Sequence, residues 1–448
     1  MESPESLFTG NSDALCILCR GAKLLCGKQR CPVLVKFYSR VRLKPLTDSL
    51  NIEGSSPPGV FVGRIGYPYV SVGPLIPPSH GDTTLLDTPE MWLGKSIDDI
   101  VDFRSQLVRG KHLVHIRDLE SSHIIEATRE MALCSSPIDV EAEFLKKPSA
   151  RLVLDDEVQP FGPTAPLKKI DVGNTKFDQR MEKAYNDTDL LSKDAVLGLY
   201  KNGILISSIQ KAFSVGSFGE GKARRFVPTR WSITAVDSMI GANLMEKMKD
   251  FPLINEYMVF ESWQLDNRFV VLMMPKAWSY ELIEAWYPNT VWNPFGKDVA
   301  IMSSSEGYEG RTTYAEIGGC YYAARLAVNE YLVKEKRQAR VVILREAHPG
   351  YIMPVGVWNV RENVRAALKT VPRKCASLNE AFEYISTRLV IPKERWIKES
   401  TVLKETLFQR GLEDFFNKFM SVCYKNLLYY PCHNFSTTIV ILILLILR

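Results

Sequence analysis

Four cysteines near the N-terminus have types and spacing that suit a metal ion. Cys16, Cys19, Cys26 and Cys31 form a C-x2-C-x6-C-x4-C cluster. Four thiolates are a ligand set for a closed, tetrahedral Zn²⁺ site. So short a segment has little apolar surface of its own, so a metal would supply the missing stability. The cluster predicts structural zinc; an iron–sulfur cluster, which four cysteines also ligate, is the alternative.

A second motif lies near the C-terminus and resembles the PCNA-interacting peptide, the PIP motif that docks on sliding clamps. A tight turn of three residues per turn would bring its leucine and two phenylalanines together as an apolar plug. Its residues are Gln409, Arg410, Gly411, Leu412, Glu413, Asp414, Phe415 and Phe416. With Phe408 and Phe419 the same side chains also recur at helical spacing, so the buried stripe of an ordinary helix is the alternative interpretation.

A third candidate is a basic segment in the middle of the chain. Lys222, Arg224, Arg225 and Arg230 follow glycines and stand among aromatic residues. Flexible backbone, cationic charge and stacking faces together suit a phosphate or a single-stranded nucleic acid. A solvated loop whose arginines pair with acids is the alternative. The sequence has no P-loop or dinucleotide-binding fingerprint.

A possible catalytic group follows an apolar run that we expect to form a buried strand. There, His348 could act as acid or base with Glu346 or Glu316, while Arg311 or Arg345 could hold a phosphate. Arg230 would line the same site. These residues define an alternative hypothesis, an enzyme that hydrolyses a phosphoester or pyrophosphate in a nucleotide or nucleic acid. A single structural histidine explains the pattern equally simply, and no hydrolase elbow or zinc-protease motif is present.

Composition sets the class of protein. The chain has 448 residues, of which 46% are hydrophobic and 24% charged, with a formal net charge of +5. These values are typical of a globular protein with a sizeable core. No signal-peptide pattern opens the sequence, which favours a cytoplasmic protein with reduced cysteines. Positive charge is concentrated between Cys16 and Leu50, where eight basic residues face the single acid Asp48.

Turn-rich segments suggest three regions. We expect a zinc-binding module with the basic run over residues 1–50, a mixed α and β core over 51–390, and a tail over 391–448 that carries the clamp motif. Proline and glycine exclude a helix between Gly63 and Asp82. The expected fold class is therefore an α/β or α+β core with a small N-terminal module and a C-terminal tail.

Hydrophobic periodicity predicts the elements of that core. A β-hairpin is expected over Tyr257–Leu265 and Phe269–Met274, and a buried strand over Arg340–Arg345. The expected helices span Lys193–Phe213, Ser232–Lys249, Tyr314–Arg337, Asn359–Lys369 and Leu378–Thr387.

The apolar run Ile439–Leu447 is about half as long as a membrane-spanning helix, which needs roughly 20 residues. We therefore expect no stable membrane insertion. A membrane contact made by this run is a less favoured alternative.

Several motifs together carry a family resemblance. The cysteine cluster is followed by Ser56–Arg64, Gly66-Tyr67-Pro68 and Gly73-Pro74, then by Pro228–Ser232, and finally by the clamp motif. This order resembles the archaeal Nre family of DNA repair proteins. The resemblance implies a role in DNA repair, a four-cysteine zinc finger at Cys16 to Cys31, and a PIP motif at Gln409 to Phe416. In that family the motif lies at or very near the C-terminus, whereas Asn417 to Arg448 follow it here.

The leading hypothesis is a DNA-damage repair factor recruited to the PCNA clamp and associated with the nucleoid. Its basic N-terminus would approach DNA, and its tail would raise the local concentration at the clamp.

Overall fold

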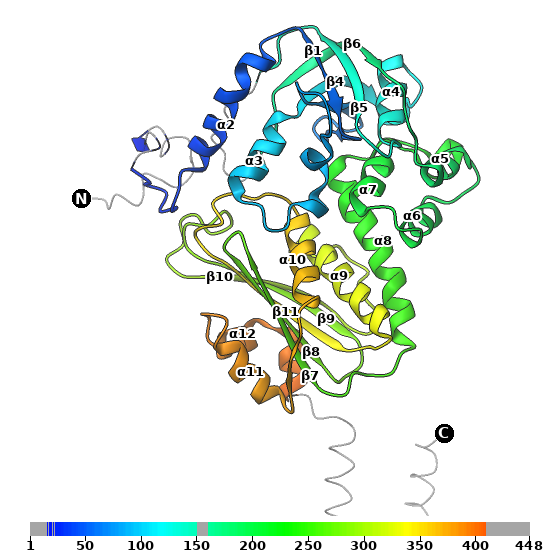
Figure 1. Cartoon of the computed structure of the whole chain (residues 1–448). Helices are drawn as coiled ribbons and strands as arrows, with labels where there is room; N and C mark the ends of the chain where they lie inside the picture. The colour runs from blue at the N-terminus through cyan, green and yellow to red at the C-terminus, as the bar shows by residue number, and fades with distance from the viewer. Residues whose placement is uncertain (1–15, 17, 20, 22, 150–159, 409–448) are drawn as a thin grey trace, which may run out of the picture. The chain divides into compact units, whose positions relative to one another are not determined.

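The structure is a computed structural model that describes residues 16, 18, 19, 21, 23–149 and 160–408 (Figure 1). The chain divides into two compact units, Met1–Ser400 and Thr401–Arg448. In the second unit the described residues form helix α13, Thr401–Phe408. The first unit contains two mixed sheets with helices packed against them, an α+β core as the sequence predicts.

The first sheet has the strand order β1-β5-β6-β4-β3-β2, and its neighbours are antiparallel except for the parallel pair β4 and β6. Alternating apolar residues such as Ile52, Val70 and Val140 fill its inner face, against which helix α4 packs. Its strands are β1 (Asn51–Ser56), β2 (Val60–Val62), β3 (Tyr69–Ile76), β4 (Val108–His115), β5 (Ile138–Phe144) and β6 (Thr164–Val172).

Helices precede, cover and follow this sheet. Helix α3 starts with a capping box, in which Ser96 and Asp99 each accept from the other's backbone N–H. The α-helices up to the second sheet are α2 (Pro32–Thr47), α3 (Ile97–Gln106), α4 (His123–Met131), α5 (Gln179–Asn186), α6 (Ser192–Lys201), α7 (Ile206–Ser214) and α8 (Thr229–Lys249). Short 3-10 turns are η2 (Thr84–Asp87), η3 (Pro89–Met91) and η4 (Gly221–Ala223).

The second sheet has the order β10-β9-β11-β8-β7-β12, with β9 and β11 as its parallel pair. Helices α9 and α10 cover one face, and α11 and α12 lie on the other (Figure 1). Its strands are β7 (Tyr257–Gln264), β8 (Asn267–Met274), β9 (Ser279–Trp286), β10 (Ala300–Glu306), β11 (Arg340–Ala347) and β12 (Arg373–Cys375). The helices are α9 (Gly319–Glu335), α10 (Trp358–Leu368), α11 (Leu378–Ser386) and α12 (Lys393–Glu399).

Most predicted elements are confirmed, and two boundaries were wrong. The helix expected over Lys193–Phe213 is two helices, α6 and α7, because Gly203 adopts φ +79° between them and ends the first. The long helix expected from Tyr314 starts only at Gly319, after Gly318 with φ +75°. The hairpin β7–β8 and strand β11 occur where periodicity places them.

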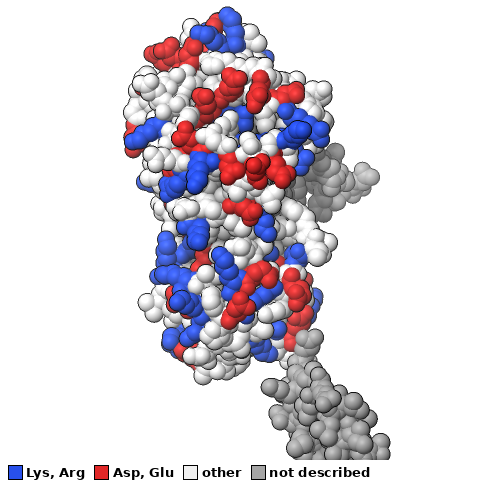
Figure 2. Space-filling model, turned by 90° about the vertical axis from the view of Figure 1, so that its right-hand side faces the viewer, with Lys and Arg blue, Asp and Glu red and all other residues white. Residues whose placement is uncertain are grey.

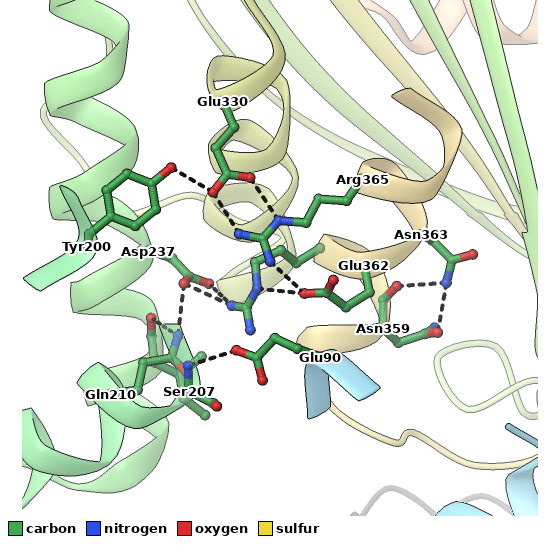
Figure 3. Close-up of polar contacts among 12 residues, drawn as sticks. Glu90, Tyr200, Ser207, Gln210, Asp237, Glu330, Asn359, Glu362, Asn363 and Arg365 are labelled. Carbon is green, nitrogen blue, oxygen red and sulfur yellow. Dashed lines mark hydrogen bonds and ion pairs between the residues drawn. The ribbon is translucent and has the colours of Figure 1, made fainter. Parts of the chain in front are cut away.

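A buried network of charges fastens α8 to α9 and α10 (Figure 3). Arg361 donates to both carboxylate oxygens of Asp237, at 2.9 and 3.0 Å. Arg365 bridges Glu362 at 2.9 Å and Glu330 at 2.7 Å. Burial raises the pKa of Asp237 to about 6, against the opposing pull of Arg361. These contacts fix the orientation of α8, whose N-terminal end belongs to the candidate site.

Candidate nucleic-acid interface

Two segments far apart in the sequence meet at the start of α8. The first is the loop after β2, and the second is Pro228–Ser232. The backbone N–H of Val62 donates to Thr229 Oγ1 at 2.9 Å. The rings of Tyr67 and Trp231 lie 5.2 Å apart between centroids. Both segments belong to the motifs that carry the family resemblance, so the fold joins those motifs in one surface.

Four arginines on or next to these segments have no acidic partner among the described residues. A hydrogen bond of 2.8 Å from the Phe226 N–H to the Ile116 carbonyl joins the residue after Arg225 to the residue before Arg117. The side chains of Arg64, Arg117, Arg225 and Arg230 are exposed. None of these four side chains makes a hydrogen bond or ion pair with any residue that the structure describes. Guanidinium groups beside exposed aromatic rings suit phosphates and bases.

The four sequence-predicted basic residues separate into two kinds. Lys222, Arg225 and Arg230 are exposed, as a phosphate contact requires. Arg224 instead donates to the carbonyls of Gly219, Tyr185 and Asp187, at 2.7, 2.7 and 2.8 Å. Its guanidinium therefore holds the loop in place and is not oriented for a ligand.

The positive charge of this surface is local. Asp118 and Glu120, both exposed, are the acids that follow Arg117 most closely in sequence. On the face that Figure 2 shows, acidic and basic side chains are interspersed and form no extended field of one sign. The net charge of the chain is only +5, so a nucleic acid bound at this surface would depend on a few arginines at one place.

The cysteine segment packs on the core. Arg30 makes a bidentate ion pair with Asp98 of α3, with both N–O distances 2.7 Å. A Cβ on Gly27, which has φ +68°, would lie 2.4 Å from Asn289 Cγ, so this close approach to the loop after β9 requires glycine. Arg30 is thereby engaged in docking and not in contacting phosphate.

All four cysteine thiols of this segment are buried or partly buried. Cys31 is the N-cap of α2, and Cys19 is buried. Hydrogen bonds from backbone N–H groups, chiefly that of Leu25, lower the pKa of the Cys19 thiol, which favours the thiolate that a metal needs. No group of three or more His, Cys, Asp or Glu side chains able to hold a metal ion occurs among the described residues. Zinc therefore stays a prediction that rests on the donor set.

His348 and Glu346 form a local pair. His348 Nε2 lies 3.0 Å from Glu346 Oε2. The other carboxylate oxygen of Glu346 accepts from the backbone N–H groups of Val390 and Ile391, both at 2.8 Å. Glu346 is fully buried and caps the chain that leads into α12. This arrangement gives both side chains a structural role.

Arg311 and Glu316 form a separate pair. Arg311 Nη2 lies 3.1 Å from Glu316 Oε2, and Ser304 donates to the same oxygen at 2.8 Å. No hydrogen bond or ion pair within the described ranges joins this pair to His348 and Glu346, or either pair to Arg230. Four of the five candidates are engaged in two separate local pairs, and Arg230 joins neither, so the geometry gives the hydrolase hypothesis no support.

The PIP motif, Gln409 to Phe416, and the apolar run Ile439–Leu447 lie outside the described residues. Within 16–149 and 160–408, apart from the few positions not described, no helix combines the length and apolarity needed to cross a membrane.

Sequence reasoning missed Arg64, Arg117 and Tyr67 as members of the surface. Gly63-Arg64 and Gly66-Tyr67-Pro68 were recognised as motifs, but spacing alone did not assign them a role. The hydrogen bond from Val62 to Thr229, across 167 residues, and the Tyr67–Trp231 ring contact show that they share a site with Arg230.

The sequence motifs indicate one protein family, and the comparison with known proteins agrees with that indication. The chain belongs to the archaeal Nre family, whose N-terminal and C-terminal family models match residues 25–293 and 306–415. This confirms the resemblance inferred from the motifs.

Individual relatives extend over most of the chain. DNA repair protein NreB of Archaeoglobus fulgidus is 41% identical over 401 residues, 89% of this chain and 99% of that protein. DNA repair protein NreA of the same organism is 37% identical, covering 84% of this chain and 93% of its own length. DNA repair protein NreA of Haloferax volcanii is 33% identical, over 79% of this chain and 86% of that protein. No solved structure matches the chain.

Proposed function

We propose that this protein is a DNA repair factor that binds DNA through the surface formed by Arg64, Tyr67, Arg225, Arg230 and Trp231. The family and the names of its relatives support a repair role. The observation that carries the DNA contact is the group of exposed arginines without partners beside the Tyr67–Trp231 ring contact. Such a protein works at the nucleoid, in the cytoplasm.

Removing two of these arginines should weaken DNA binding and its dependence on salt. For Arg64→Gln/Arg230→Gln we expect at least about tenfold lower affinity, because a hydrogen bond to a charged group contributes roughly 1.5–3 kcal/mol. The slope of log K against log salt should fall in magnitude by about 0.9 for each duplex phosphate that the variant no longer neutralises. Fluorescence anisotropy of a labelled duplex over a salt series measures both quantities.

The matched control is Arg373→Gln/Lys374→Gln in β12. These side chains are exposed but pair with Glu380 and Glu256, at 3.4 and 2.7 Å. The control removes the same charge from another place. Equal loss of affinity in both double variants would show that net charge, and not this surface, binds DNA.

The cysteine segment would hold a structural zinc ion through Cys16, Cys19, Cys26 and Cys31. Zinc there would stabilise the turn before α2 and leave no position for a substrate. Metal analysis of the purified chain should find about one zinc per molecule, and none in Cys26→Ser/Cys31→Ser. Iron and sulfide with visible absorbance would instead identify an iron–sulfur cluster. Absence of both zinc and iron from the purified chain would refute the metal site.

Recruitment to the PCNA sliding clamp through Gln409 to Phe416 completes the proposal. The motif would dock its leucine and two aromatic rings in an apolar pocket, while the first unit contacts DNA. Because tethering raises effective concentration, even a weak clamp contact would increase occupancy of the DNA surface.

A further inference from the structure

The loop between β2 and β3 exposes apolar side chains beside the arginines. Ile65 is 89% exposed, Tyr69 57%, Trp231 46% and Tyr67 45%. A single exposed apolar residue is ordinary, but four on adjoining segments form a patch, and such patches commonly mark binding sites. Arg64 and Arg230, both exposed, directly precede Ile65 and Trp231 in the sequence, so cationic side chains neighbour the apolar ones along the chain.

Hydrogen bonds hold this loop in one conformation. The Gly63 N–H donates to the Ser71 carbonyl at 2.8 Å, and the Tyr69 N–H donates to the Gly66 carbonyl at 2.9 Å. At the base of the loop, the Ile116 N–H donates to the Pro68 carbonyl at 3.0 Å. Tyr67 leans on Trp231 with an angle of 54° between the ring planes. The tip therefore presents Ile65 with little further ordering cost on binding.

These side chains can contact parts of DNA that an intact duplex covers. Aromatic rings stack on the faces of unpaired bases, and apolar side chains act as wedges against base steps. In a continuous duplex each base face is covered by its neighbour. Base faces are accessible where a duplex ends in single strand, at gaps, forks and overhangs.

We propose that this surface recognises a junction between duplex and single-stranded DNA. Ile65 abuts the last base pair, Tyr67 and Trp231 stack on unpaired bases, and Arg64 and Arg230 contact the phosphates on either side. This inference rests on the proposed function, that the chain binds DNA here, and adds the class of DNA. The neighbouring cationic side chains favour DNA over an apolar protein partner, for which arginines without partners would be a cost.

The test compares two labelled DNAs, a blunt duplex and the same duplex with a single-stranded overhang. The full chain should bind the overhang DNA roughly 5- to 150-fold more tightly for each base stacked. Ile65→Ser and Tyr67→Ser should each reduce that preference, measured as the ratio of the affinities for overhang and blunt DNA. Trp263→Ser is the control, because Trp263 on β7 is another exposed tryptophan, at 58%. It should keep the preference.

A second measurement needs no variant. The fluorescent base 2-aminopurine, placed at the first unpaired position, should change its emission when a ring of the protein stacks on it. Equal affinity for both DNAs, or a preference that Ile65→Ser and Tyr67→Ser leave intact, would overturn the junction inference while DNA binding stands. Absence of binding to either DNA would overturn the proposed function as well.

Discussion

Replacing Arg361 with methionine should lower the free energy of unfolding by about 3–5 kcal/mol, the range found when one partner of a buried ion pair is removed. Arg361 is 1% exposed and Asp237 is fully buried. Without the guanidinium, the Asp237 carboxylate keeps only the amide of Gln210, at 2.9 Å, as a side-chain partner shown by the described residues. Urea unfolding followed by circular dichroism measures the loss.

Two comparisons make this prediction specific. Adding Asp237→Asn to Arg361→Met should recover part of the loss, since it removes the orphaned charge. Arg373→Met, which breaks an exposed pair, should change stability by less than about 1 kcal/mol. A loss for Arg361→Met no larger than that control's would contradict the buried network.

The loss of stability caused by Arg361→Met should depend on pH in a defined direction. The pKa of Asp237 is raised from 3.8 to about 6, so its ionisation favours the unfolded chain and its contribution to stability falls as pH rises from 3.8 to about 6. In Arg361→Met the same carboxyl is harder still to ionise. The difference in the free energy of unfolding between the variant and the parent chain should therefore shrink as the pH falls to about 6.

The second large effect concerns the clamp motif. Phe415→Ala/Phe416→Ala should reduce affinity for the cognate sliding clamp by roughly 10²- to 10⁴-fold, because each buried ring contributes about 1.5–3 kcal/mol. Calorimetric titration of the clamp with the full chain and the double variant measures this change.

Phe419→Ala is the matched control for that titration. It removes one ring of the same apolar periodicity from outside the motif, so clamp affinity should stay the same. Equal weakening by Phe419→Ala, together with lower thermal stability of both variants, would favour a buried helix stripe over a docking motif.

Local patterns predicted part of the fold, since the elements located by their bounds all lie from Lys193 onward and include no strand of the first sheet. Hydrophobic patterns found β8 and β11 because both strands are buried on both faces and form short, continuous apolar runs. They also found β7 and α10. They missed the break between α6 and α7, because the apolar spacing continues across Gly203 while the helical backbone conformation ends there.

The candidate site was predictable only in part. Lys222, Arg225 and Arg230 stand in one basic segment, but Arg224, with the same charge, is turned toward three carbonyls. Arg64 and Tyr67 lie more than 160 residues away, and the segments are linked by a hydrogen bond to Thr229 and by the Tyr67–Trp231 ring contact. Spacing within a segment cannot reveal such a contact, because it depends on how the first sheet packs against α8.

The clearest test of the DNA surface is to map where DNA touches the full chain. Ultraviolet crosslinking of the bound overhang DNA, followed by mass spectrometry of the peptides, locates the contacts. We expect crosslinks at Tyr67 or Trp231, in peptides that also contain Arg64 or Arg230. Crosslinks confined to the segment from Cys16 to Leu50, with none at the loop after β2 or the start of α8, would contradict a DNA surface at this place.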